Sequence, residues 1–102
     1  MNSIKIWENW KQYTTVPAMY EALAEECSEL AKAALKTSRI MRGENPTPIK
    51  KVEAIKQVEE EFTDVISCAI ALDLNIDVKQ SVTKFERMKQ RHNEFHSACQ
   101  ED

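Results

Sequence analysis

The chain is almost free of the residues that break helices. Its 102 residues include a single glycine, Gly43, and three prolines, Pro17, Pro46 and Pro48. Because tight turns and strand-rich folds need many such residues, their scarcity predicts a few long elements. Apolar residues also recur at steps of three and four, as they do on one face of a helix. The sequence therefore predicts an all-α fold, formed as a single domain over residues 1–102.

Capping residues divide the first half of the chain. Asn2 or Ser3 is expected to cap a short first helix that ends near Tyr13. Thr14 and Thr15, followed by Pro17, should open a second helix. That helix is expected to run to about Arg42 and to stop at Gly43, because glycine adopts the left-handed end of a helix without strain.

Similar signals divide the second half. Thr47 followed by Pro48 predicts the start of a third helix, which should end near Asp73. Asp77 with Gln80 resembles a capping box and should open a fourth helix, expected to fray after Phe95.

Two acidic clusters of the same composition lie thirty-five residues apart. The first spans residues 25–30 (EECSEL) and the second spans residues 60–65 (EEFTDV). At the spacing of an α-helix, Glu26 and Glu61 lie beside their apolar stripes, and Glu29 and Asp64 lie about 60° further round. If the two helices pack face to face, these carboxylates meet and repel one another unless a cation is bound. The alternative is an ordinary solvated acidic face.

The chemistry of these ligands restricts the metal. Oxygen ligands alone suit Mg²⁺, with Mn²⁺ as a second possibility, and suit zinc or copper poorly. A di-iron bundle would need Glu-x-x-His on two helices, and neither cluster contains a histidine. His92 and His96 are one turn apart near the C-terminus, with Cys99 beyond. A frayed, solvated last turn is a better interpretation of them than a second metal site.

The two motifs, in this order, resemble those of the MazG-like nucleotide pyrophosphohydrolases, in the all-α NTP pyrophosphatase superfamily. Residues 42–47 (RGENPT) add to the resemblance, which covers about residues 20–95. It implies a four-helix bundle-like protomer that forms a homodimer or a dimer of dimers. It also implies two metal-binding pairs, and the corresponding residues here are Glu26, Glu29, Glu61 and Asp64. The resemblance further implies that Glu25 helps to position a catalytic water, with Glu26 and Glu61 as the other catalytic carboxylates.

The activity implied by the resemblance is cleavage of a (d)NTP to the (d)NMP and pyrophosphate. A pyrophosphohydrolase specific for phosphoribosyl-ATP or for a single dNTP would use the same chemistry. A third hypothesis is a non-enzymatic acidic helical module that oligomerises or binds a basic partner. Magnesium dependence and pyrophosphate release separate the two enzymes from the module, and a substrate panel separates the enzymes from each other.

Basic and aromatic residues are the candidate nucleotide ligands. Lys84, Arg87 and Arg91 share one face of the expected fourth helix and could bind phosphates, although a solvated face is an equal alternative. Trp10, three residues after Trp7, could stack on a base. Aromatic residues at this spacing are more often part of the core.

Charge and composition exclude other classes of protein. The formal net charge of −3 provides no attraction to nucleic acid or to an anionic membrane. No apolar run approaches the ~20 residues that span a bilayer, and the N-terminal residues do not resemble a signal peptide. The three cysteines, Cys27, Cys68 and Cys99, are an odd number with no paired spacing, which indicates free thiols in a reducing compartment. A cytoplasmic location is therefore expected.

Overall fold

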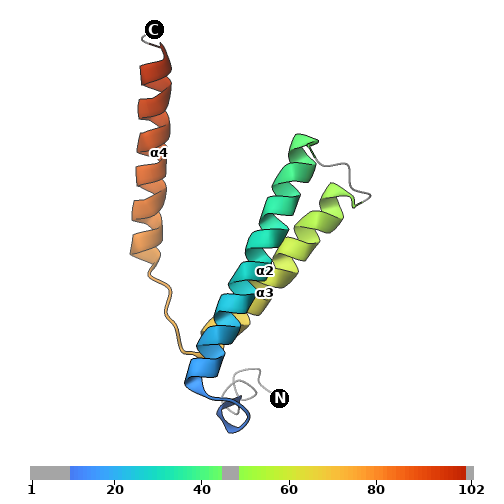
Figure 1. Cartoon of the computed structure of the whole chain (residues 1–102). Coiled ribbons are helices and arrows are strands. Elements are labelled where there is room, and N and C mark those ends of the chain that lie inside the picture. The colour runs from blue at the N-terminus through green and yellow to red at the C-terminus, as the bar shows by residue number, and fades with distance from the viewer. Residues whose placement is uncertain (1–9, 45–48, 101–102) are drawn as a thin grey trace.

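The computed structural model describes residues 10–44 and 49–100, with side chains as far as residue 98. Three earlier predictions lie outside these residues: the start of the first helix at Asn2 or Ser3, the role of Trp7, and the helix start at Thr47 and Pro48. The described part of the chain contains a short 3-10 turn and three α-helices and no strand. In chain order they are η1 (Trp10–Gln12), α2 (Val16–Arg42), α3 (Lys51–Ala71) and α4 (Val78–Gln100). The all-α prediction is confirmed (Figure 1).

The ends of α2 follow from their capping residues. Thr15 has an extended backbone, and its hydroxyl accepts a 3.2 Å hydrogen bond from the backbone N–H of Ala18. At the other end Gly43 has a φ of 68°, and the N–H groups of Gly43 and Glu44 donate to the carbonyls of Ile40 and Arg39. These bonds satisfy carbonyls that the helix leaves free, so the predicted stop at Gly43 is confirmed.

The start of α3 differs from the prediction. The residue before the helix is Lys50, whose backbone is extended (φ −75°, ψ 153°), and its side chain makes no capping bond. The helix therefore begins at Lys51, and the predicted start at Thr47 and Pro48 is wrong. The proline signal favoured an earlier start, but Lys50 is extended, and its carbonyl accepts the first helical bond from the N–H of Ala54.

The end of α3 falls two residues before the predicted one. Asp73 has a positive φ of 55°, and its N–H donates to the carbonyl of Ile70. The N–H of Leu74 donates to the carbonyl of Ala69, which completes the same type of C-terminal cap that ends α2. Aspartate tolerates this left-handed conformation better than most residues, so it ends the helix without a glycine.

The two helices α2 and α3 form an antiparallel hairpin that holds the small core. Ala54 is 1% exposed and is the most buried residue of this core. The buried hydroxyl of Thr37 donates to the carbonyl of Ala33 at 2.8 Å and reaches the carbonyl of Ala54 at 3.3 Å. This cross-helix bond satisfies a buried polar group and fixes the register of the hairpin.

A second contact closes the end of the hairpin. The ring of Trp10 is buried, and its Nε1–H donates to the carbonyl of Ala71 at 2.8 Å. This bond ties η1 to the last residue of α3, across 61 positions of sequence. The hairpin is therefore fixed near its loop end by Thr37 and at its open end by Trp10.

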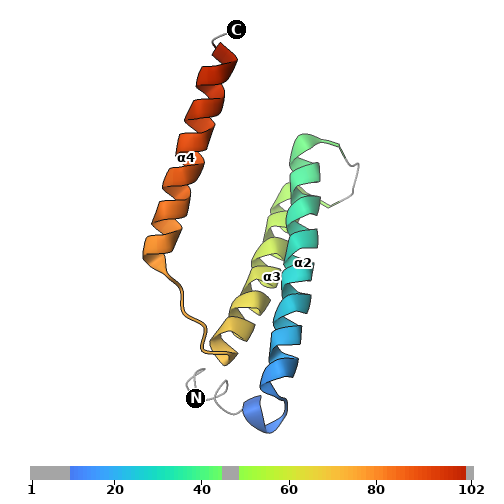
Figure 2. The same ribbon diagram turned by 60° about the vertical axis from the view of Figure 1, so that its left-hand side comes forward.

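Helix α4 stands apart from the hairpin (Figures 1 and 2). Its first turn is capped as predicted, because the N–H of Gln80 donates to Oδ1 of Asp77 at 3.0 Å. It continues to Gln100, so the predicted fraying after Phe95 is wrong. Among the described elements only α2 and α3 pack extensively. The predicted four-helix bundle is therefore not confirmed within one chain.

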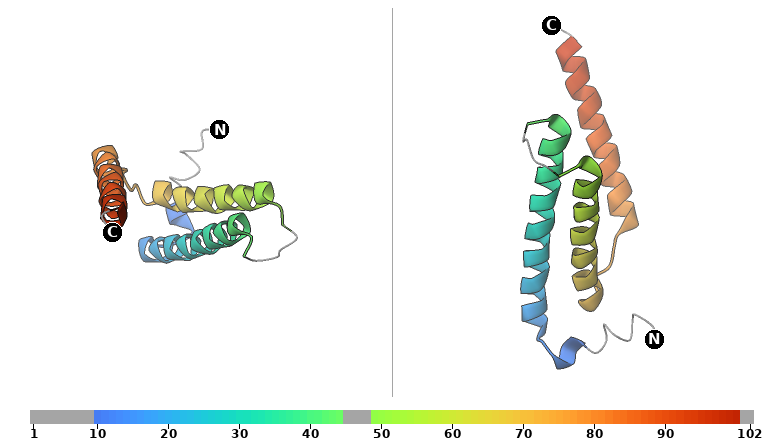
Figure 3. Two further views of the ribbon diagram at one scale, coloured as in Figure 1. Left: turned by 90° about the horizontal axis from the view of Figure 1, so that it is seen from above. Right: turned by 90° about the vertical axis from the view of Figure 1, so that its right-hand side faces the viewer.

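The overall dimensions reflect this separation. The radius of gyration is 18.6 Å and the extents are 62 × 39 × 25 Å. A compact domain of this length has a radius of gyration of about 13 Å. The view from above shows α4 beside the hairpin without joining it (Figure 3). No helix in the described residues is long and apolar enough to cross a membrane.

Candidate metal centre

Three carboxylates from the two acidic motifs meet on one side of the hairpin. Glu26 of α2 and Glu61 and Asp64 of α3 each offer an oxygen, and these oxygens lie within 4.8 Å of one another. Glu26 and Glu61 are half-buried beside the core, whereas Asp64 is exposed. The helical spacing predicted this order of burial, and the structure confirms it.

Local sequence explains why these side chains share one side. Glu61 and Asp64 are three residues apart in α3, so they project from adjacent positions on the helix surface. The hydroxyls between and beyond them bond back to their own helix, with Thr63 donating to the carbonyl of Glu59 and Ser67 to that of Thr63. The polar residues between the carboxylates are therefore satisfied locally and do not compete for the cluster.

The fourth predicted ligand, Glu29, lies beside the cluster but is not within the same set of close oxygens. Its Oε1 accepts from Nζ of Lys32 at 3.4 Å, and both side chains are exposed. An exposed pair of this kind stabilises a helix by about 0.5 kcal/mol or less, so a bound cation would readily displace it. Glu25, the predicted water-positioning residue, is exposed on the outer side of α2.

Electrostatics single out Glu61. Partial burial raises its pKa, and the carboxylates of Asp64, Glu26, Glu29 and Glu60 raise it further, in that order. The ionised form of Glu61 is thus disfavoured by its surroundings, which a cation among the carboxylates would reverse.

The nearby thiol responds to the same charges. Burial raises the pKa of Cys68, and the carboxylates of Glu26 and Asp64 raise it further. Cys68 is 9% exposed, whereas Cys27 is exposed. Because the thiolate is the reactive form, Cys68 should be an inert thiol under the cluster rather than a nucleophile.

The raised pKa of Glu61 predicts a pH-dependent stability for the metal-free protein. A carboxyl whose pKa is higher in the folded than in the unfolded state binds more protons when folded. The free energy of unfolding should therefore fall as the pH rises from about 4.5, the ordinary value for Glu, through the raised pKa. Chemical unfolding in EDTA across this range, compared with Glu61→Gln, measures the effect. Equal pH profiles for the two proteins would contradict it.

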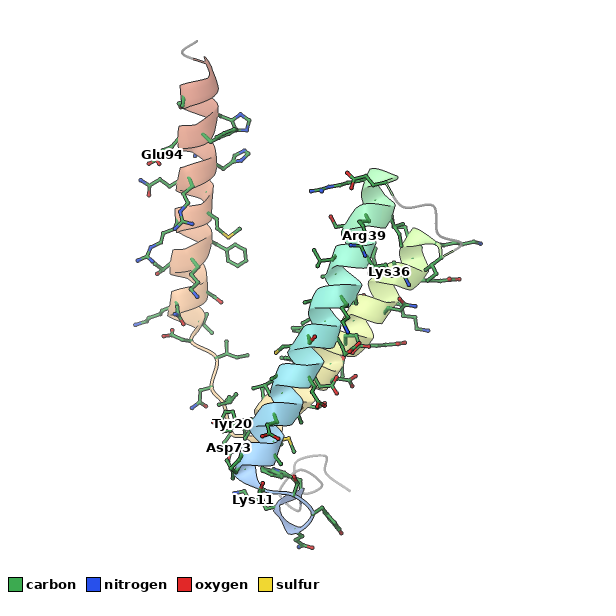
Figure 4. The ribbon with its side chains drawn as sticks, viewed as in Figure 1. Lys11, Tyr20, Lys36, Arg39, Asp73 and Glu94 are labelled. Atoms are coloured by element: carbon green, nitrogen blue, oxygen red, sulfur yellow. The ribbon has the colours of Figure 1, made fainter. Side chains whose placement is uncertain are left out.

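A groove extends from the cluster along the hairpin towards its loop end. It has a volume of about 380 Å³ and is lined by Glu29, Lys32, Ala33, Lys36, Gln57, Glu60 and Glu61. Carboxylates occupy one end, and Lys36 lies further towards the loop, on the same part of α2 as Arg39 (Figure 4). The groove thus places carboxylates that could bind a metal cation next to positively charged lysine side chains.

The two lysines of this groove were not among the predicted substrate ligands. Lys32 and Lys36 follow Glu29 by three and seven residues, and these are the spacings that place residues on one face of a helix. This signal was present in the sequence. The predicted phosphate ligands were instead the basic residues of the fourth helix.

Those basic residues are not brought to the carboxylates of their own chain. Lys84, Arg87 and Arg91 do lie together, with Met88, around a surface hollow of about 250 Å³. The hollow lies on α4, which stands apart from the hairpin (Figure 2). His92 and His96 lie further along α4 and pack against each other, with ring centroids 4.3 Å apart.

Trp10 is a core residue in this structure. It is 8% exposed and its indole N–H is bonded to Ala71. With so little of the residue exposed, the predicted stacking on a base does not fit this arrangement. The alternative weighed from the sequence, a tryptophan in the core, matches it.

Comparison with known proteins adds no relative: no family model, curated protein or solved structure matches the chain. The resemblance to the MazG-like enzymes therefore rests on the sequence motifs alone.

Proposed function

We propose that the chain is a Mg²⁺-dependent nucleoside triphosphate pyrophosphohydrolase that converts a (d)NTP to the (d)NMP and pyrophosphate. The observation that carries the proposal is the convergence of Glu26, Glu61 and Asp64 from two separate motifs. The half-burial of Glu26 and Glu61 favours a bound cation over a solvated acidic face, because repulsion between partly buried carboxylates is poorly screened.

The donor set fits a hard divalent cation. All three ligands are carboxylates, and Glu61 is held in surroundings that oppose its charge. Glu26, Glu61 and Asp64 would hold Mg²⁺ or Mn²⁺, and Glu29 could join them by leaving Lys32. The cation would neutralise a polyphosphate and activate water for attack on phosphorus.

The remaining residues of the groove suit the substrate. Lys32 and Lys36 lie on the same wall as Glu29, where they can bind phosphate oxygens that extend away from the carboxylates. Glu25 lies on the exposed outer side of α2 and is the candidate for positioning the attacking water. In this account Lys84, Arg87 and Arg91 reach a polyphosphate only if α4 approaches a hairpin.

We expect Lys36→Gln to weaken nucleotide binding and to leave the metal-free fold unchanged. Loss of one charge-assisted bond to phosphate should raise KM about tenfold. Lys56→Gln is the matched control, because Lys56 lies on α3 outside the groove. Steady-state kinetics with the preferred substrate provide the measurement. Similar KM values for the two variants would remove Lys36 from the site.

A different observation favours the non-enzymatic alternative. Many large apolar side chains are exposed on both the hairpin and α4, as expected of a module whose role is to assemble. The enzyme and the module are not exclusive, because the proposed enzyme is also a homodimer or a dimer of dimers.

A substrate panel tests the function directly. Each NTP and dNTP, and phosphoribosyl-ATP, is incubated with the protein and Mg²⁺, and pyrophosphate is measured with EDTA as the control. Pyrophosphate from several nucleotides supports the broad enzyme, and pyrophosphate from one alone supports a specialised enzyme. A folded protein that releases none with Mg²⁺ or Mn²⁺ leaves the oligomerisation module as the better account.

A further inference from the structure

Helix α4 carries an apolar stripe that none of the described residues covers. Steps of three and four residues place its apolar side chains on one side of the helix. They are 57–69% exposed, and they are Val78, Val82, Phe85, Met88 and Phe95. In proteins most of the stability of a helix comes from packing of its apolar face, so this stripe calls for a partner.

The hairpin also has an uncovered apolar face, on the side away from the carboxylates. At about 100° per residue, Tyr20 lies about 120° around α2 from Glu26, in the direction opposite to Glu29. Phe62 and Ile70 lie around α3 from Glu61, in the direction opposite to Asp64. Because α2 and α3 are antiparallel, this rotation brings both sets to one side of the hairpin. Its exposed members are Val16, Tyr20, Leu35, Val52, Phe62 and Ile70.

The uncovered area is as large as a stable dimer needs. The chain exposes 8646 Å², whereas a folded monomer of 11.8 kDa exposes about 5,900 Å². If the residues outside the described ranges were as exposed as in a fully extended chain, they would contribute about 1,600 Å² to the difference between these two areas. About 1,000 Å² per copy is left on the described residues, and an interface of about 2,000 Å² in total is typical of stable complexes.

Charge indicates which two surfaces meet. Residues 78–100 carry five basic and two acidic side chains, a net charge of +3. Two α4 helices would therefore repel each other. The half of the hairpin formed by residues 16–31 and 57–71 contains eight carboxylates and no lysine or arginine. At about 100° per residue, Glu21 and Glu59 lie beside the apolar face, and the other six lie on the side of the candidate metal centre. Glu21 and Glu59 complement the basic side chains of α4.

The connection favours a second copy over the chain's own hairpin. After the left-handed turn at Asp73 the chain leads to the capped start of α4 at Asp77, and α4 projects away from α3 (Figures 1 and 3). We propose that α4 is an exchanged arm, whose apolar stripe docks on the apolar face of the α2–α3 hairpin of a second copy of this chain.

Light scattering of the full chain tests the interface. The wild type should be a dimer or larger, and Phe85→Glu should shift the mass to that of a monomer, because it places a carboxylate against an acidic, apolar surface. Thr83→Glu is the matched control, since Thr83 lies on the opposite side of α4. A monomeric wild type, or a Phe85→Glu protein that keeps the mass of the wild type, would overturn the proposal.

Cross-linking identifies the two surfaces and the copy that each comes from. With the native cysteines replaced, a copy carrying Ser81→Cys in the stripe is mixed with a copy carrying Ala24→Cys on the hairpin face. A short bismaleimide should join the two copies when they are mixed, and Thr83→Cys in place of Ser81→Cys should lower the yield about tenfold or more.

The alternatives give distinct products. A chain carrying both Ser81→Cys and Ala24→Cys that links only within itself would show that α4 folds back on its own hairpin. Ser81→Cys copies that link to one another, but not to Ala24→Cys copies, would show pairing of α4 with α4. Either product overturns the exchanged arm, and neither depends on catalytic activity.

Discussion

Replacing Glu61 with glutamine is expected to lower pyrophosphohydrolase activity by about two orders of magnitude or more. Loss of a residue that merely orients a metal ligand costs about 10–100-fold, and Glu61 is proposed as a ligand itself. The substitution keeps the shape of the side chain but removes the charge at the centre of the cluster. Initial rates of pyrophosphate release at saturating Mg²⁺ provide the measurement.

The same substitution should not destabilise the metal-free protein. Four neighbouring carboxylates raise the pKa of Glu61, so removal of its charge relieves repulsion. Glu59→Gln is the matched control, because Glu59 lies on the same helix outside the close carboxylate set. Full activity in both variants would show that Glu61 has no catalytic part.

The second large effect concerns Trp10. Trp10→Ala is expected to destabilise the fold by about 3–5 kcal/mol, because it removes a buried aromatic ring that closes the hairpin. Trp10→Phe keeps most of the ring but leaves the carbonyl of Ala71 without its indole donor, and should cost about 1–3 kcal/mol. Urea unfolding at fixed protein concentration gives both values.

Kinetics of Trp10→Phe separate a core residue from a base-stacking one. A core tryptophan predicts that KM stays within about twofold of the wild-type value. Loss of stacking on a base is worth about 1–3 kcal/mol, which would raise KM about fivefold or more. A raised KM with unchanged stability would restore Trp10 to the substrate site.

The parts of the fold set by local chemistry could be predicted from the sequence. Thr15 and Gly43 fix the ends of α2 because a side-chain cap and a left-handed glycine are local devices. The predicted start of α3 is wrong because a proline permits a helix start without requiring one. Its predicted end is late because Asp73 adopts a conformation more usual for glycine.

The candidate site could be predicted as far as helical phase determines it. Phase alone placed Glu26 and Glu61 at the hairpin contact with Asp64 beside them. The pairing of Glu29 with Lys32 depends on side-chain rotamers, which phase does not determine. The position of α4 could not be predicted, because its stripe shows that it needs a partner and not which surface provides it.

The central claim is that Glu26, Glu61 and Asp64 hold a divalent cation, and direct metal binding tests it best. Mn²⁺ can be titrated into the wild type, Glu61→Gln and Glu59→Gln, with the free ion measured by electron paramagnetic resonance. The account predicts saturable binding to the wild type and to Glu59→Gln, and at least tenfold weaker binding to Glu61→Gln. Equal Mn²⁺ binding by all three proteins, or binding by none of them, would contradict it.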